Sequence, residues 1–131
     1  MQAIGCDIVQ IPRIEQLIAK SSEAFLKRVY MPQEQENAQK YMQNPQKNAS
    51  HLAKRFAAKE AFSKAVGTGF GKSIAMNDIG VINNEAGAPE FIFSEKAKML
   101  LKEKFGDKVS VHLSLSDDYP QALAFVVITN H

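Results

Sequence analysis

The residues of this chain that could do chemistry gather first in one helix-like segment, residues 51–66. On a 3.6-residue period, Glu60 and Lys64 share a stripe with the apolar positions of that segment. The commoner interpretation of this spacing is an ordinary i,i+4 ion pair, which stabilises a helix by about 0.2–0.5 kcal/mol. A charged pair on the packing stripe must, however, be desolvated or face a site, which makes both residues candidates for a site. Arg55 and Lys59 form a second pair, one turn apart, on a neighbouring face.

A second acidic residue of interest, Asp7, lies in the middle of a short apolar run over residues 3–9. An isolated buried carboxylate is costly unless it is paired or bound to a cation. Mg²⁺ is typically held by one or two carboxylates together with substrate phosphates and water. Asp7 and Glu60 could supply two such carboxylates, although a lone G-x-D also occurs where an Asp caps a turn.

The segment 109–116 alternates between apolar residues and Ser or His, so a strand would place His112 on a serine-lined face. Such a face is more commonly exposed to solvent, and it could also be a polar wall that binds a ligand. A Ser-His-Asp hydrolase is set aside because the chain contains no G-x-S-x-G nucleophile elbow.

The glycine-rich segment 67–73 invites comparison with nucleotide-binding loops. Its end, Gly71-Lys72-Ser73, resembles a Walker A loop, but that motif needs a glycine where Val66 stands, and it follows a strand rather than a helix. The spacing G-x-G-x-x-G is not met either. We therefore interpret the segment as a helix C-cap followed by a connector that could border a ligand.

Basic residues near the N-terminus recur at a helical spacing. Arg13, Lys20 and Lys27 lie seven residues apart and would form one stripe on a continuous helix, with Arg28 beside it. A solvated helix face is the default explanation of this pattern. A docking surface for an acidic protein is the sharper hypothesis.

Composition is that of an ordinary globular protein, with 45% hydrophobic and 23% charged residues. The net charge of +2 is too small to indicate nucleic-acid binding, but six basic residues and one acid between positions 40 and 64 indicate an anion site. A single cysteine, Cys6, cannot form an intramolecular disulfide and agrees with a reducing compartment. Since no secretory leader and no apolar run of roughly 18 residues is found, we expect a full-length cytoplasmic protein without a membrane span.

A small α+β fold must position these residues. Strands are predicted near 3–9, 78–82, 90–93, 109–115 and 122–128, and helices after Pro12, from Pro32, over 51–66 and over 95–105. Ser21 and Ser22 are expected to divide the first helical stretch, and residues 44–48 to form a loop. The pattern favours one domain over 1–131, with a mostly antiparallel sheet packed against a long helix.

Taken in order, these segments resemble the holo-acyl-carrier-protein synthase family of 4′-phosphopantetheinyl transferases. Gly5-Cys6-Asp7-Ile8-Val9 is similar to the family's N-terminal G-I-D-I-V, residues 55–65 to its signature helix, residues 84–89 to its N-x-x-G-x-P turn, and residues 112–116 to its H-x-S-x-S strand. The likeness covers essentially the whole chain. The family commonly has a histidine after the last serine, where this chain has Asp117, so the role of that histidine is not carried over.

The resemblance implies a homotrimer that binds coenzyme A in clefts between subunits. Asp7 and Glu60 would bind Mg²⁺, or Mn²⁺ in its place, and Lys64 would contact phosphate beside the metal. The remaining coenzyme A contacts would come from Arg55 and Lys59, from Asn84, Gly87 and Pro89 on the adenine side, and from His112 of a neighbouring subunit. The catalytic set would be Asp7, Glu60, Lys64 and His112. The acidic helix of acyl carrier protein would dock on Arg13, Lys20, Lys27 and Arg28.

The implied reaction is attack of a carrier serine hydroxyl on the β-phosphorus of coenzyme A, which releases 3′,5′-ADP. The metal and Lys64 would stabilise the charge, and Glu60 or a metal-bound water would accept the serine proton. Two alternatives stay open. A different Mg-dependent enzyme on a nucleotide or diphosphate would turn over without a carrier protein. A non-catalytic, coenzyme A-binding trimeric module would need neither Asp7 nor Glu60 to face the ligand.

Overall fold

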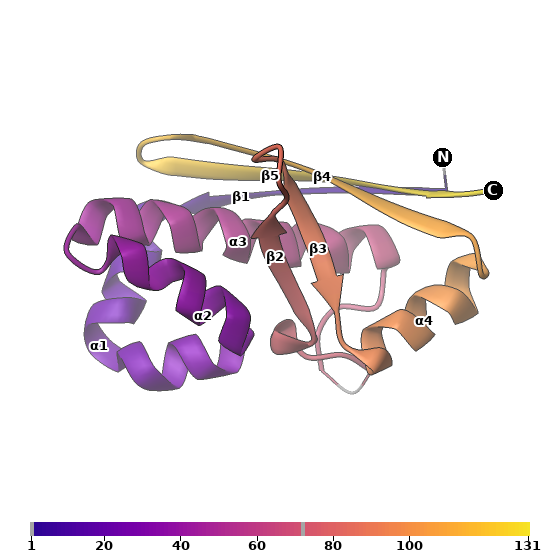
Figure 1. The fold of residues 1–131 in the computed structure, drawn as a ribbon, viewed down its shortest axis with the longest axis horizontal. Coiled ribbons are helices and arrows are strands. Elements are labelled where there is room, and N and C mark those ends of the chain that lie inside the picture. The colour runs from indigo at the N-terminus through magenta and orange to yellow at the C-terminus, as the bar shows by residue number, and fades with distance from the viewer. Residues whose placement is uncertain (1, 72) are drawn as a thin grey trace.

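A long helix laid along a three-stranded sheet forms the framework of the molecule (Figure 1). The computed structural model describes residues 2–71 and 73–131, so Met1 lies outside the described residues, as does Lys72 of the Walker-like segment. In chain order the elements are β1 (Ala3–Gln10), α1 (Ile11–Val29), α2 (Pro32–Ala38), η1 (Gln39–Tyr41), α3 (Pro45–Val66), η2 (Met76–Asp78), β2 (Ile79–Asn83), β3 (Pro89–Phe93), α4 (Glu95–Phe105), β4 (Val109–Asp118) and β5 (Gln121–Asn130).

The strands form two separate antiparallel sheets. The larger has the order β1-β5-β4, and the smaller is the hairpin of β2 and β3. In Figure 1 α3 runs beneath the larger sheet, β2 and β3 cross near its middle, α1 and α2 lie toward one end, and α4 lies toward the other. The predicted α+β class, with antiparallel strands packed against a long helix, is confirmed.

Small side chains allow α3 to approach the sheet closely. The inward positions of β5 are Ala122, Ala124, Val126 and Ile128, and all are fully buried. Alanines also dominate the buried face of α3, namely Ala53, Ala57, Ala58 and Ala61. The core therefore lies between helix and sheet, and the residues of β1 that point inward face the backbone of α3 at short range.

Helix α3 begins earlier than predicted, at Pro45 rather than at His51. Asn44 is the N-cap, and its side-chain oxygen accepts a hydrogen bond from the Lys47 amide at 3.1 Å. Proline is well suited to the first turn of a helix because the missing N–H has no partner to lose there. The predicted loop over 44–48 is therefore wrong beyond Asn44, whereas the predicted end at Gly67 is confirmed by its left-handed φ of +87°.

Helix α1 is interrupted at Ser21, whose φ of −144° and ψ of 44° are not helical. The predicted division of this stretch is confirmed, and consequently Arg13 and Lys20 precede the kink while Lys27 follows it. The single basic stripe, expected only for a continuous helix, therefore does not form. Of the helices described, none is both long and apolar enough to cross a membrane.

Strand β4 runs to Asp118 and β5 begins at Gln121, so the two form a tight hairpin. Asp117 and Asp118, which lie beyond the strand predicted near 109–115, belong to β4. On the side of the larger sheet away from α3, Ile4, Ile8, Leu123 and Phe125 remain 41–55% exposed. This apolar outer face has no covering element in the described part of the chain.

Candidate active site

Gly5 brings β1 unusually close to α3. A Cβ atom at Gly5 would overlap the carbonyl oxygen of Ala61 and lie 2.7 Å from the amide nitrogen of Ala65. No side chain other than glycine's hydrogen fits such a separation. Because side chains alternate along a strand, Asp7 points toward α3 like Gly5, and it reaches the helix near its C-terminal half.

Asp7, Glu60 and Lys64 come together at this contact, as the family resemblance implied. The Lys64 ammonium donates a hydrogen bond to Asp7 Oδ1 at 3.0 Å, and the side chains are 59% and 16% exposed respectively. This bond raises the pKa of Lys64. Burial raises the pKa of Glu60, and the negative charge of Asp7 raises it further, while Arg13 and Lys64 act in the opposite direction.

The donor set fits a hard divalent cation. Among residues 2–71 and 73–131 no group of three or more His, Cys, Asp or Glu side chains gathers, so a cation would have the two carboxylates of Asp7 and Glu60 alone. Two carboxylates completed by phosphate oxygens and water are the usual environment of Mg²⁺, and oxygen ligands also suit Mn²⁺. The repulsion between Asp7 and Glu60, seen in the raised pKa of Glu60, is what a cation would relieve.

Lys59 does not contact a ligand, contrary to the prediction from the sequence. Its side chain is 0% exposed, and its ammonium donates to Glu34 Oε1 at 2.6 Å inside the core. Burial lowers the pKa of Lys59 to about 8, against the opposing effect of Glu34. Glu34 was not among the predicted site residues, because an acidic residue in the first turn of a short helix does not indicate a partner in the core.

The side chain of Asn84 orders the turn between β2 and β3. Asn84 Oδ1 accepts hydrogen bonds from the amides of Ala86 and Ala88 at 2.9 and 3.0 Å, and Gly87 has a φ of +86°. Arg55 Nη2 donates to Asn83 Oδ1 at 3.2 Å, which places the guanidinium beside this turn. Arg55 itself is only 5% exposed, so most of it is covered by its own chain.

His112 lies on the opposite side of the larger sheet from Asp7. It belongs to the exposed polar row of β4, as the alternation predicted, and its Nε2 lies 3.2 Å from Thr129 Oγ1. Asp7 points to the other side, toward α3. The two residues of one chain are therefore not brought together.

Arg13 connects α1 to the same site. Its guanidinium lies over the ring of Phe56, 5.6 Å from the centroid, and Phe56 precedes Glu60 by one helical turn. The positive charge of Arg13 lowers the pKa of Glu60, against the larger effects of burial and of Asp7. Lys20 and Lys27 are exposed farther along α1. The basic residues of α1 thus begin at the carboxylate cluster.

An open hollow of about 550 Å³ lies beside the N-terminal half of α3 and is lined by Lys47, His51 and Lys54 among others. Lys54 pairs there with Asp117 at 3.2 Å, so the residue that replaces the family's histidine is held by its own chain. Burial, and then the charge of Arg55, lowers the pKa of His51 to about 3 and keeps this ring neutral.

Comparisons with known proteins agree over nearly the full chain. The family model described as the 4′-phosphopantetheinyl transferase superfamily matches residues 3–124. A holo-[acyl-carrier-protein] synthase of Zymomonas mobilis is 48% identical over 128 residues, which cover 95% of this chain and 93% of that protein. The synthase of Ruthia magnifica is 44% identical over 125 residues, with 95% and 94% covered.

Solved structures show the same fold. The holo-[acyl-carrier-protein] synthase of Neisseria meningitidis superimposes with a TM-score of 0.88 at 38% identity, covering 99% of both chains. The synthase of Bacillus anthracis, solved in complex with CoA (3′,5′-ADP), has a TM-score of 0.80 at 35% identity, covering 99% of this chain and 97% of that one.

Proposed function

The chain belongs to the 4′-phosphopantetheinyl transferase superfamily, and from this premise we propose how its own residues perform the transfer. It is an enzyme of the holo-acyl-carrier-protein synthase type. It moves the 4′-phosphopantetheine group of coenzyme A onto a serine of apo-acyl carrier protein and releases 3′,5′-ADP. The family identified from the ordered motifs is thereby confirmed.

The observation that carries the assignment of residues is the meeting of Asp7, Glu60 and Lys64 where β1 touches α3. Asp7 and Glu60 would hold Mg²⁺, or Mn²⁺, together with the diphosphate of coenzyme A. The cation would supply positive charge to the phosphate oxygens during the transfer. Lys64 is exposed enough to leave Asp7 and contact a phosphate, which adds a second positive charge at the same place.

In the reaction the carrier serine oxygen forms a bond to the β-phosphorus of coenzyme A. The bond from that phosphorus to the bridging oxygen breaks, and 3′,5′-ADP leaves with the electron pair. Glu60 accepts the serine proton, directly or through a water, because burial and the negative charge of Asp7 raise its pKa and make it a better proton acceptor. Lys64 stabilises the charge that develops on the leaving group.

The nucleotide part of coenzyme A would lie against the turn that begins after β2. Asn84, Gly87 and Pro89 form its adenine-side wall, and Arg55, bonded to Asn83, stands beside it with a positive charge. The structures of relatives solved with CoA or 3′,5′-ADP support a nucleotide site in this fold. We call residues 83–89 the nucleotide wall.

A trimer would complete the site. The apolar outer face of Ile4, Ile8, Leu123 and Phe125 suits a contact with further copies of the chain, because an exposed patch of this kind commonly marks an interface. His112 lies on that outer side and would contact the ligand of a neighbouring subunit, since it cannot reach Asp7 of its own. Residues 1–131 act as one transferase domain in each subunit.

The carrier protein would dock along α1, with Arg13 nearest the carboxylates and Lys20, Lys27 and Arg28 farther away. The kink at Ser21 means that two basic groups rather than one stripe meet the acidic carrier. Cys6 is a free, exposed thiol, which suits the cytoplasmic location that we propose for the reaction.

Intact-mass spectrometry of apo-acyl carrier protein tests this function. Incubation with the enzyme, coenzyme A and Mg²⁺ should add one phosphopantetheine, and EDTA or replacement of the carrier serine should prevent it. Turnover of coenzyme A without any carrier would instead identify a different Mg-dependent enzyme. Coenzyme A binding that is indifferent to Mg²⁺, with no transfer, would identify a non-catalytic module.

A further inference from the structure

The β2–β3 hairpin carries the nucleotide wall but shares no backbone ladder with the larger sheet. Apolar packing attaches one side of it to α3: the ring of Phe62 lies 5.5 Å from that of Phe91 and 5.4 Å from that of Phe93, centroid to centroid. Such packing is favourable but not directional, so it allows a hairpin to slide or tilt by a fraction of a residue. One directional bond, from Arg55 Nη2 of α3 to Asn83 Oδ1 at 3.2 Å, holds the end of β2. The beginning of β2 needs directional bonds of its own if the nucleotide wall is to be fixed relative to Asp7 and Glu60.

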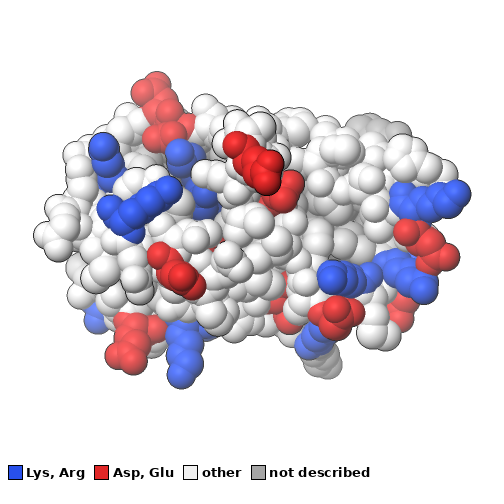
Figure 2. All heavy atoms as spheres, viewed as in Figure 1, with Lys and Arg blue, Asp and Glu red and all other residues white. Residues whose placement is uncertain are grey.

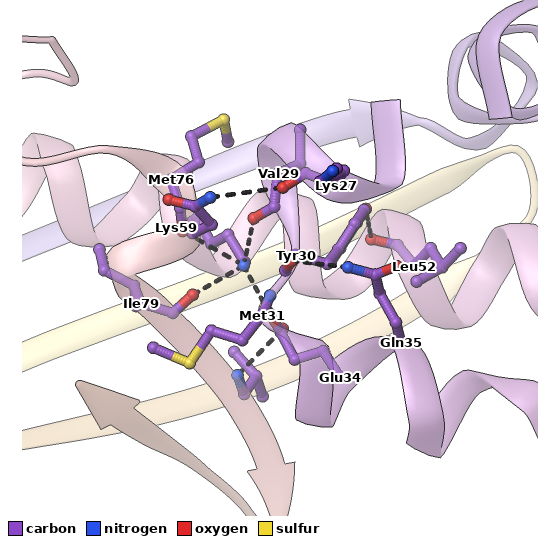
Figure 3. A network of polar contacts seen from close by, with 12 residues as sticks. Lys27, Val29, Tyr30, Met31, Glu34, Gln35, Leu52, Lys59, Met76 and Ile79 are labelled. Atoms are coloured by element: carbon purple, nitrogen blue, oxygen red, sulfur yellow. Dashed lines mark hydrogen bonds and ion pairs between the residues drawn. The ribbon is translucent and has the colours of Figure 1, made fainter. Parts of the chain in front are cut away.

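The buried ammonium of Lys59 provides directional bonds at this point (Figure 3). It donates to the carbonyl oxygen of Ile79, the first residue of β2, at 2.7 Å, and to that of Val29 at the end of α1 at 2.6 Å. A longer contact of 3.3 Å reaches the Met76 carbonyl oxygen. One side chain of α3 therefore holds α1, η2 and β2 together.

Glu34 of α2 completes the arrangement from the other side. Its Oε1 accepts from Lys59 and, at 3.0 Å, from the amide of Met31, while its Oε2 accepts from the amide of Val81 at 3.0 Å. The ion pair is thus hydrogen-bonded to the β2 backbone at Ile79 and at Val81, on either side of Gly80. At Gly80 a Cβ atom would lie 2.7 Å from Met31 Sδ, so the strand is also pressed closely onto this region.

We propose that Lys59 and Glu34 are positioning residues that set the nucleotide wall at the correct place relative to Asp7 and Glu60. The inference rests on the proposed coenzyme A site. Lys59 precedes Glu60 in the same helix, and Val81 precedes Asn83 in the same strand, so each end of the ion pair is adjacent to one side of that site. Neither residue touches the ligand, because both side chains are fully buried.

A fully buried ion pair is a poor way to gain stability, since replacing both partners by apolar residues is often neutral or stabilising. Removing one partner alone leaves an uncompensated buried charge and is strongly destabilising. Replacing both residues by apolar ones therefore separates a role in folding stability from a role in positioning the nucleotide wall. It removes the hydrogen bonds from Lys59 to Ile79 and from Val81 to Glu34 and keeps the packing filled, while the Arg55–Asn83 bond remains.

The test compares wild type with the double variant Glu34→Leu/Lys59→Met. Isothermal calorimetry measures the affinity for 3′,5′-ADP, and steady-state kinetics measures KM for coenzyme A and for the carrier protein. We expect cooperative unfolding and an almost unchanged carrier KM. The 3′,5′-ADP affinity should fall by about tenfold or more, with a parallel rise in KM for coenzyme A, because small misplacements of a binding wall are costly.

Lys104→Met is the matched control. The Lys104 ammonium donates to the Val66 carbonyl oxygen at 2.8 Å, so this variant also removes a lysine bond to backbone, but at the far end of α3. It should leave 3′,5′-ADP affinity unchanged. If the double variant does not fold, Glu34→Gln/Lys59→Met replaces it: no charge stays buried and the amide oxygen can still accept from the Met31 amide, but the Lys59 bonds to Val29 and Ile79 are lost. A loss of nucleotide affinity is then expected again.

A folded double variant with wild-type affinity for 3′,5′-ADP would overturn the inference, and so would an equal rise in both KM values. If Glu34→Gln/Lys59→Met is the variant used, unchanged affinity overturns the inference in the same way. Wild-type protein that binds no 3′,5′-ADP would overturn the proposed nucleotide site itself, which is a different result from a wild-type site that is insensitive to the ion pair.

Discussion

At the scale of single residues, the site depends on groups whose environment opposes their charge. Glu60 is partly buried beside Asp7, and both effects favour its protonated form. Lys64 restores part of the balance through its bond to Asp7. A site of this kind lowers the folding stability of the protein. A cation bound there should raise it again, since a ligand that binds only the folded state stabilises that state.

The first prediction concerns Glu60→Gln. The raised pKa of Glu60 means that the folded chain binds this proton more tightly than the unfolded chain, whose carboxyl titrates near the usual 4.5. The free energy of unfolding should therefore fall as pH rises from that value through the folded pKa. In EDTA at pH 7 the variant should melt at a higher temperature than wild type, and the difference should vanish below the usual carboxyl pKa.

The same variant should lose at least about 100-fold in kcat/KM for transfer, the scale of a general base and of metal binding combined. Scanning calorimetry with and without Mg²⁺ and the mass-shift assay measure the two effects. Mg²⁺ should raise the melting temperature of wild type but not of Glu60→Gln. A variant that stays active, or a wild type that Mg²⁺ does not stabilise, would remove Glu60 from the metal site.

Gly5 gives the second prediction. Gly5→Ala places a methyl group against the backbone of Ala61 and Ala65, where neither a rotamer nor a flexible neighbour can yield. Overpacking of this kind costs about 1–3 kcal/mol, which urea unfolding measures. Asp7 should move away from α3 with the strand, so Mn²⁺ affinity measured by electron paramagnetic resonance should fall as well. Ala3→Gly at another inward position of β1 is the control and should leave Mn²⁺ affinity unchanged.

At the scale of elements, α1 is two basic segments joined at Ser21 rather than one stripe. Only the first segment touches the site, because Arg13 lies over Phe56, one turn from Glu60. Docking on α1 should therefore depend most on the residues before the kink. Basic and acidic side chains are interspersed over the face shown in Figure 2, so no single-sign field covers it and local placement decides the contact.

The third prediction follows from that geometry. Lys20→Glu should raise KM for the carrier protein several-fold more than Lys27→Glu, while KM for coenzyme A stays constant, because a like charge opposes an acidic partner. Added salt should weaken carrier binding by wild type and reduce the difference between the variants. Lys108→Glu, an exposed charge reversal outside α1, is the control. Equal carrier KM values for all three would place docking elsewhere.

The sequence predicted elements well where local signals agreed and less well where one signal had two meanings. The pair Asn44-Pro45 is typical both of a loop and of a helix start, and only the fold shows that Asn44 caps α3. Asp7 and Glu60 were recognisable as candidates because a charge among apolar residues is visible in the sequence, whereas their grouping with Lys64 came from the family resemblance. Lys59 was not, since its partner Glu34 is 25 residues away and decides whether the lysine points to ligand or to core.

At the scale of the whole molecule, one chain holds only part of the proposed site. Asp7 and His112 belong to opposite sides of the same sheet, and the outer side is apolar at Ile4, Ile8 and Phe125. A closed ring of subunits with head-to-tail contacts would bring the His112 of one chain to the Asp7 of the next. Such a ring makes catalysis depend on pairs of chains rather than on single chains.

The last prediction tests this dependence by subunit complementation. Asp7→Asn and His112→Ala chains should each have little activity alone, because every site in either ring lacks one residue. When the two are unfolded, mixed in equal amounts and refolded together, a contact is intact where the Asp7 of a His112→Ala chain meets the His112 of an Asp7→Asn chain. Random assembly of a head-to-tail ring makes about a quarter of the contacts intact, so about a quarter of wild-type transfer should return.

Mixing Asp7→Asn with Glu60→Gln is the matched control: both residues come from the same side of the contact, so no intact site can form and no activity should return. Recovery in neither mixture, with trimers present by light scattering, would mean that His112 serves the site from no neighbouring chain.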